Sequence, residues 1–277
     1  MSIKKKGITP VLAHLLVFVV IFSLFLSSYY IFYPYISKMK SKSEIKKVEN
    51  DLIELTEKLS IVIERKNKQF LSLLVDKGKI TLLPYKNFII YEIEVPYSPY
   101  YYSWYDILNN RPMPIDMCEE SNNKLVNCTV EKLGANCIKK SNFLYSCYFP
   151  ALNNITVDYL LVDKYEITQD QTDKGKVVFI NTKPVLRVVK DAPPCSLYVN
   201  VEYSQKKEKL TYYIVCNIKK KRETCIIPVL TGNLVATPVV KTNIVINYKK
   251  EEYVPNFNYY NCKDAYLRYI EIKTIRR

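Results

Sequence analysis

The sequence contains very little histidine and glycine. His14 is the only histidine among the 277 residues, and glycine occurs five times. Triads of the Ser-His-Asp or Cys-His type need an imidazole base, and His14 lies inside an apolar run. A glycine-rich phosphate-binding loop is also missing. Carboxylates are adjacent at Glu119-Glu120 and Glu251-Glu252, but neighbouring side chains of a strand point to opposite faces. We therefore expect no enzymatic activity and no cofactor.

Formally charged residues are missing from Gly7 to Ser37. A transmembrane helix needs about 20 predominantly apolar residues, so this run is long enough to span a bilayer. A secretory signal has an apolar region of only about 7–15 residues and a small-x-small cleavage site. The best such site, around Ser27, has bulky neighbours such as Leu26. We therefore predict a retained transmembrane helix over residues 8–37.

Local features of this run fit the two ends of a membrane helix. Thr9 is a suitable N-cap, and Pro10 fits the first turn, where its missing N–H costs nothing. Pro34 is expected to kink the helix near its other end. His14 is expected to reach the head groups. An aromatic belt at one membrane interface is expected from Tyr29, Tyr30, Tyr33 and Tyr35.

The positive charge is unevenly distributed. The formal net charge is +14, and residues 1–79 hold 14 Lys and Arg against 7 Asp and Glu. An excess beside an apolar segment favours anionic lipid head groups over nucleic acid. The basic run Lys219–Arg222 is predicted to be a solvated turn. Lysines flank the apolar run on both sides, so the lysine count does not set its orientation.

The N-terminus resembles a known family at this point. Lys5-Lys6-Gly7, then Ile8–Val11, then a long apolar helix resembles the class III signal of archaeal type IV pilin-like proteins. The resemblance implies a cut by prepilin peptidase between Gly7 and Ile8. It also implies that other pilin-like subunits contact the apolar helix. Leu12 stands where bacterial pilins carry glutamate. The alternative is an ordinary signal anchor with a chance Lys-Gly.

An amphipathic helix is predicted over residues 38–68. Its apolar positions recur at 3-4 spacing, while acidic residues and Lys58 occupy the other faces. The stripe could pack on the chain's own β-domain, which we prefer, or on helices of neighbouring subunits. The apolar positions are Ile45, Val48, Leu52, Leu55, Leu59 and Val62.

The remainder, residues 69–277, is predicted to be a mainly antiparallel, sandwich-like, disulfide-rich β-domain outside the cytoplasm. Short apolar runs separated by turn residues indicate strands rather than helices. A sub-boundary is possible near residues 191–194. The predicted strands are Phe70–Val75, Lys79–Leu83, Phe88–Val95, Thr156–Val162, Lys176–Ile180, Leu186–Val189, Leu197–Tyr203, Lys209–Ile218, Thr224–Leu230, Asn243–Tyr248 and Leu267–Ile275.

Eight cysteines in a chain with an export-type helix suggest disulfides. Zinc is disfavoured because no Cys-x-x-Cys pair occurs and His14 lies in the apolar run. One hairpin register would oppose Cys118 to Cys147 and Cys128 to Cys137, with all four on one face. Pairing Cys118 with Cys128 and Cys137 with Cys147 stays open; we prefer the nested scheme. The remaining predicted pairs are Cys216–Cys225, across the basic run, and Cys195–Cys262.

Two further features concern the surface of the β-domain. Asn127 and Asn154 begin N-glycosylation sequons. Residues 96–105 concentrate tyrosines and the single tryptophan between prolines. Such rings offer apolar area with polar tips for binding, but the preferred interpretation is that they cover the sandwich core. The candidate contact residues are Tyr100, Tyr101, Tyr102, Trp104 and Tyr105.

The whole pattern predicts a non-enzymatic, pilin-like surface protein in the cell membrane. The chain is large for a major pilin, so a minor or accessory filament subunit acting in assembly or adhesion is preferred. Its expected partners are the lipid bilayer, prepilin peptidase and other pilin-like subunits, without nucleic acid or metal. The alternative is a permanent single-pass surface protein or receptor with an extracytoplasmic β-domain.

Overall fold

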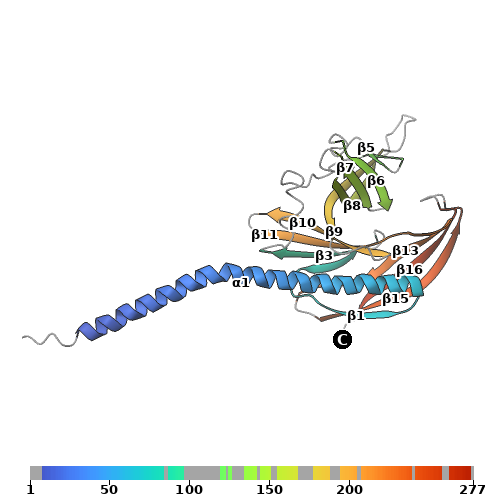
Figure 1. Ribbon diagram of the computed structural model, residues 1–277. Helices are drawn as coiled ribbons and strands as arrows, with labels where there is room; N and C mark the ends of the chain where they lie inside the picture. The colour runs from blue at the N-terminus through green and yellow to red at the C-terminus, as the bar shows by residue number, and fades with distance from the viewer. Residues whose placement is uncertain are drawn as a thin grey trace, which may run out of the picture.

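The computed structural model consists of one long helix followed by a β-rich region (Figure 1). It describes residues 8–83, 87–96, 119–122, 124–126, 134–141, 144–150, 155–167, 177–187, 194–204, 207–238, 241–257 and 262–275. The elements are α1 (Ile8–Arg65), β1 (Gln69–Leu74), β2 (Lys79–Leu83), β3 (Phe88–Val95), β4 (Glu119–Ser121), β5 (Lys124–Val126), β6 (Asn136–Ser141), β7 (Leu144–Phe149), β8 (Ile155–Ile167), β9 (Val177–Arg187), β10 (Cys195–Ser204), β11 (Lys207–Cys216), β12 (Lys219–Lys221), β13 (Thr224–Asn233), β14 (Val235–Ala236), β15 (Lys241–Pro255) and β16 (Asp264–Ile275).

The two helices expected from the sequence form one continuous helix, α1, of 58 residues. Pro34 lies inside it, where proline removes one hydrogen bond of the ladder. Figure 1 shows that α1 bends between a projecting part and a part that lies across the sheets. The helix ends at Arg65 rather than at residue 68. Lys66 has a φ of 54°, which is the left-handed conformation common just after a helix C-terminus.

The strands form two sheets. A five-stranded sheet has the order β1-β15-β16-β13-β12, and a longer one runs β14-β2-β3-β11-β10-β9-β4-β5-β6-β7-β8. Most pairs are antiparallel, as predicted. However, β13 and β16 are parallel, with Thr224 opposite Asp264 at the start of the shared register. A parallel pair needs a long crossover, here through β14 and β15, which local sequence patterns do not show.

The second half of α1 is part of the core that it shares with both sheets. Leu55, Leu59 and Val62 are 0% exposed. They belong to one cluster with Leu197 of β10 and Ile246 of β15, which lie in different sheets. The preference for packing on the chain's own β-domain is therefore confirmed. Below, the head means the β-rich region together with α1 from Ser41 onward.

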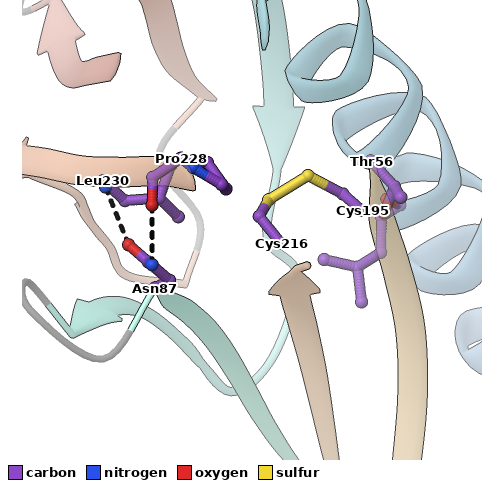
Figure 2. The surroundings of a disulfide bond; sticks show 7 residues. Thr56, Asn87, Cys195, Cys216, Pro228 and Leu230 are labelled. Carbon is purple, nitrogen blue, oxygen red and sulfur yellow. Dashed lines mark hydrogen bonds between the residues drawn. A yellow bond between two sulfur atoms is a disulfide. The ribbon is translucent and has the colours of Figure 1, made fainter. Parts of the chain in front are cut away.

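Asn87 joins the two sheets just before β3 begins. Its side-chain Nδ2 donates to the carbonyl oxygen of Pro228 at 2.7 Å, and its Oδ1 accepts from the backbone N–H of Leu230 at 2.9 Å (Figure 2). The amide thus satisfies two backbone groups of β13 beyond the end of β12. Asn87 has a φ of 54°, a conformation that asparagine tolerates better than most residues.

One strand prediction and one turn prediction were wrong in detail. The expected strands Lys176–Ile180 and Leu186–Val189 are one strand, β9, which includes Pro184. Among the described residues, Pro184 lies opposite Tyr159 of β8 and has no partner on the other side of β9, an edge position where proline is tolerated. The basic run predicted as a turn contains β12, an exposed edge strand, and only the turn at Arg222 follows.

The hairpin register that motivated the nested cysteine scheme was also wrong. It required a turn centred near residues 131–134 that opposed residues summing to 265. Instead, β6 pairs with β7, and Cys137 lies opposite Cys147. β5 and β6 meet with Lys124 opposite Ile138. The position of the turn determines which residues lie opposite one another in a hairpin. The even spacing of the cysteines is therefore compatible with several pairing schemes.

Candidate functional site

The first half of α1 is an exposed apolar surface, which we call the stem and define as residues 12–40. Its large apolar side chains are 45–81% exposed, and the first buried residue is Ser41, at 3%. Soluble monomers rarely expose an apolar surface of this extent. The stem therefore needs a cover, either lipid or other apolar helices.

The chemistry of the stem suits an environment without water. Ser23 Oγ donates to the carbonyl oxygens of Val19 and Val20 at 2.8 and 2.9 Å, and Ser27 Oγ donates to that of Ser23 at 2.8 Å. The hydroxyl groups are thus satisfied within the helix. Within the described residues, α1 is the one helix long and apolar enough to cross a membrane.

The tyrosines predicted as an aromatic belt lie on the stem next to the head. All four are exposed, from 57% for Tyr29 to 81% for Tyr30. The rings of Tyr29 and Tyr33, one helical turn apart, have centroids 5.4 Å apart. This placement fits a ring of amphipathic side chains at one end of an apolar span, and the belt stays a prediction.

The start of the head part of α1, which we call the base of α1, is held by two ion pairs to the turn between β1 and β2. Lys47 Nζ lies 2.6 Å from Asp76 Oδ2, and Lys77 Nζ lies 3.2 Å from Glu44 Oε2. Gly78 completes the turn with a φ of 81°, and a Cβ there would lie 2.1 Å from the carbonyl oxygen of Glu92. The turn therefore requires glycine and sits against β3 on one side and α1 on the other.

A carboxylate and two tyrosines lie between the base of α1 and the β3–β11 pair. Tyr212 OH donates to Glu49 Oε1 at 3.3 Å, and the rings of Tyr212 and Tyr91 are 6.1 Å apart. Tyr91 OH donates to the carbonyl oxygen of Lys77. Burial raises the pKa of Glu49, although the bond from Tyr212 opposes this. Burial also raises the pKa of both tyrosines, so they remain neutral donors.

The end of α1 is anchored by a second set of charges. Arg268 Nη1 donates to the carbonyl oxygen of Ile63 at 2.5 Å, and Arg268 Nε lies 2.5 Å from Glu251 Oε2. Lys66 Nζ lies 3.0 Å from the other oxygen of Glu251. Burial opposes ionisation of Glu251, but the bonds from Arg268 and Lys66 hold its pKa below the ordinary value. Cations at a helix C-terminus also complement the helix dipole.

The disulfide bonds of the structure differ from the predicted pairs. Its bridges are Cys137–Cys147, Cys195–Cys216 and Cys225–Cys262. The predicted pairs Cys118–Cys147, Cys128–Cys137, Cys195–Cys262 and Cys216–Cys225 were therefore wrong. The alternative pair Cys137–Cys147 is present, whereas Cys118 and Cys128 lie outside the described residues.

Strand register explains two of the new bridges. Cys195 and Cys216 are opposed at the ends of the β10–β11 hairpin, as Cys137 and Cys147 are in β6–β7. Figure 2 shows the first of these bridges beside the part of α1 that carries Thr56. Cys195 and Cys216 have the same summed residue number as the opposed residues Ser204 and Lys207, so the spacing in the sequence is compatible with this pair.

Several predicted site residues lie outside the described part of the chain. They are Lys5, Lys6 and Gly7 of the processing motif, the sequon residues Asn127 and Asn154, and the aromatic residues Tyr100, Tyr101, Tyr102, Trp104 and Tyr105. Ile8 is the first residue of α1.

The sequence did not reveal the ion pairs at the base of α1, because Asp76 and Lys77 look like ordinary turn residues.

In the described part of the chain, no group of three or more His, Cys, Asp or Glu residues could hold a metal ion. The chemistry of the site is thus that of an exposed apolar helix with charged contacts at its base.

No family model matches the chain, and neither the curated proteins nor the solved structures provide a match.

Proposed function

We propose that this chain is a non-enzymatic, pilin-like protein that is inserted in the cell membrane and displays its head outside the cytoplasm. In this proposal it acts as a minor or accessory subunit of a type IV pilus-like filament, in assembly or adhesion. The stem spans the bilayer before assembly. After a cut at the Gly7–Ile8 bond, the stem moves into a filament core, where apolar helices pack side by side.

The division of α1 is the observation that supports the proposal most. Its first half exposes apolar side chains such as Phe25, at 72%, while its second half buries Leu55 and Leu59 at 0%. A single helix thus joins an apolar stem to a folded head without an intervening loop. Such a stem can pass from lipid to neighbouring helices without repacking the head, because its exposed apolar side chains are not part of the core cluster, which begins on α1 at Ile45.

Photocrosslinking from the stem tests the assembly step. A photoreactive phenylalanine derivative at Phe22, which is 54% exposed, should crosslink to another apolar helix when filaments form. The same derivative at Phe70, exposed at 57% on the head, is the matched control and should not reach a stem. Crosslinks from position 22 to lipid alone, in cells that make filaments, would favour a permanent single-pass anchor instead.

A further inference from the structure

Four exposed lysines lie on α1 where the stem meets the head. They are Lys38, Lys40, Lys42 and Lys46, and we call them the lysine collar. Lys38, Lys42 and Lys46 are spaced four residues apart, so they follow one side of the helix. Among the ion pairs and hydrogen bonds of the described ranges, none includes a collar residue.

The acidic residues near the collar already have other partners. Glu44 is the first acidic residue of the chain. Its carboxylate lies 3.2 Å from Lys77 Nζ, and that of Asp76 lies 2.6 Å from Lys47 Nζ. Glu49 turns toward Tyr212 in the head. The positive charge of the collar is therefore left without a counter-charge from the described residues around it.

The collar also lies at a defined depth relative to the stem. A helix rises about 1.5 Å per residue, so the predicted span of residues 8–37 is about 45 Å long, enough for the hydrocarbon core and both head-group regions of a bilayer. Lys38 directly follows this span, and Ser41 is already buried in the head. Lysine side chains reach back several ångströms toward the interface. The collar thus falls at head-group level on the side of the head.

We propose that the lysine collar binds anionic lipid head groups of the leaflet on the side of the head. This inference rests on the membrane insertion of the proposed function and adds the lipid class and the residues. Lysines near an anionic leaflet are attracted within a Debye length, about 8 Å at physiological salt. The paired lysines at positions 47 and 77 contribute less, because their charge is offset by Asp76 and Glu44.

The preference of the full chain for anionic over zwitterionic lipids can be measured with spin-labelled lipids. The protein is reconstituted in phosphatidylcholine bilayers with a trace of spin-labelled phosphatidylglycerol or phosphatidylcholine, and the motionally restricted fraction of each is compared. We expect a several-fold preference for phosphatidylglycerol that falls sharply at 1 M salt, where the Debye length is about 3 Å. The variant with all four collar lysines changed to glutamine should lose most of the preference.

A matched variant controls for net charge. It carries Lys124→Gln, Lys220→Gln, Lys221→Gln and Lys241→Gln, four exposed lysines of the head, and should keep the preference of the wild type. The inference is overturned if the collar variant keeps the preference for phosphatidylglycerol, because lysines elsewhere, such as Lys4–Lys6, would then be its source. It is also overturned if both variants lose the preference equally. Flotation with carbonate extraction reports insertion separately. A chain that fails to insert contradicts the proposed function and the inference together, whereas an inserted chain without lipid preference contradicts the inference alone.

Discussion

Arg268 of β16 donates a hydrogen bond to the backbone carbonyl oxygen of Ile63 at 2.5 Å, across 205 positions of the sequence. The same guanidinium binds Glu251, which also binds Lys66 just beyond the helix end. The last strand of the chain thus holds the last turn of the helix that begins at Ile8. Head and stem are connected through α1, so this contact helps to fix the stem to the head.

Arg268→Ala is expected to lower the free energy of unfolding by about 1–3 kcal/mol, because it leaves the carbonyl oxygen of Ile63 without its side-chain donor and the partly buried carboxylate of Glu251 with Lys66 alone. Lys273→Ala is the control. It removes an exposed partner of Glu271 on the same strand, and surface pairs contribute only about 0–1 kcal/mol. Denaturant unfolding measures both. Equal losses for the two variants would contradict this anchoring role.

Leu59→Ala should destabilise the head by about 2–5 kcal/mol, since Leu59 is 0% exposed between the two sheets. Leu24→Ala makes the same chemical change at a residue that is 63% exposed on the stem. It should leave the thermal unfolding of the head in detergent unchanged. A comparable loss of stability from both variants would show that stem and head do not unfold as separate parts.

The sequence predicted the buried face of α1 well and the disulfides poorly. Five of the six predicted stripe positions, Ile45, Leu52, Leu55, Leu59 and Val62, are 0–1% exposed, and Val48 is partly buried against the same core. Helical periodicity is a local property that the sequence displays directly.

Disulfide partners, by contrast, depend on where each hairpin turns. Because β7 pairs with β6 in another register than predicted, Cys147 lies opposite Cys137 rather than Cys118. The parallel β13–β16 pair was missed for a related reason, since its strands are joined by a long crossover. The ion pairs at the base also depend on tertiary contacts, as in Lys77 with Glu44, 33 residues apart.

Peptide mapping under non-reducing conditions should recover the bridges Cys137–Cys147, Cys195–Cys216 and Cys225–Cys262. The double variant Cys195→Ala/Cys216→Ala opens a bridge with a sequence separation of 21 residues. The chain-entropy model assigns such a loop roughly 3 kcal/mol, so the unfolding midpoint should fall accordingly. Recovery of a Cys195–Cys262 peptide would contradict the register of β10 and β11.

Glu49→Gln should make the head less sensitive to pH. Burial raises the pKa of Glu49 above its unfolded value, so the folded state holds the proton more tightly. The stability from this group is complete below the unfolded pKa, about 4.3, and is lost as pH rises through the folded value. The variant should therefore match or exceed the wild type in unfolding free energy at pH 7. This advantage should vanish near pH 4.

Glu57→Gln, at an exposed position of the same helix, is the control for Glu49→Gln and should leave the pH profile of the wild type unchanged. Urea unfolding between pH 4 and pH 8 provides the comparison. A loss of stability at pH 7 in the Glu49 variant would mean that the ionised carboxylate supports the head through its bond from Tyr212.

The central claim concerns the bond between Gly7 and Ile8, and intact-mass measurement of the membrane-extracted protein tests it most directly. The account predicts a mature chain that begins at Ile8, the first residue of α1. Gly7 replaced by a bulky residue should abolish the cut and leave the chain in the membrane. A mature chain that begins at Met1 or Ser2, in cells with active prepilin peptidase, would contradict the pilin-like mechanism.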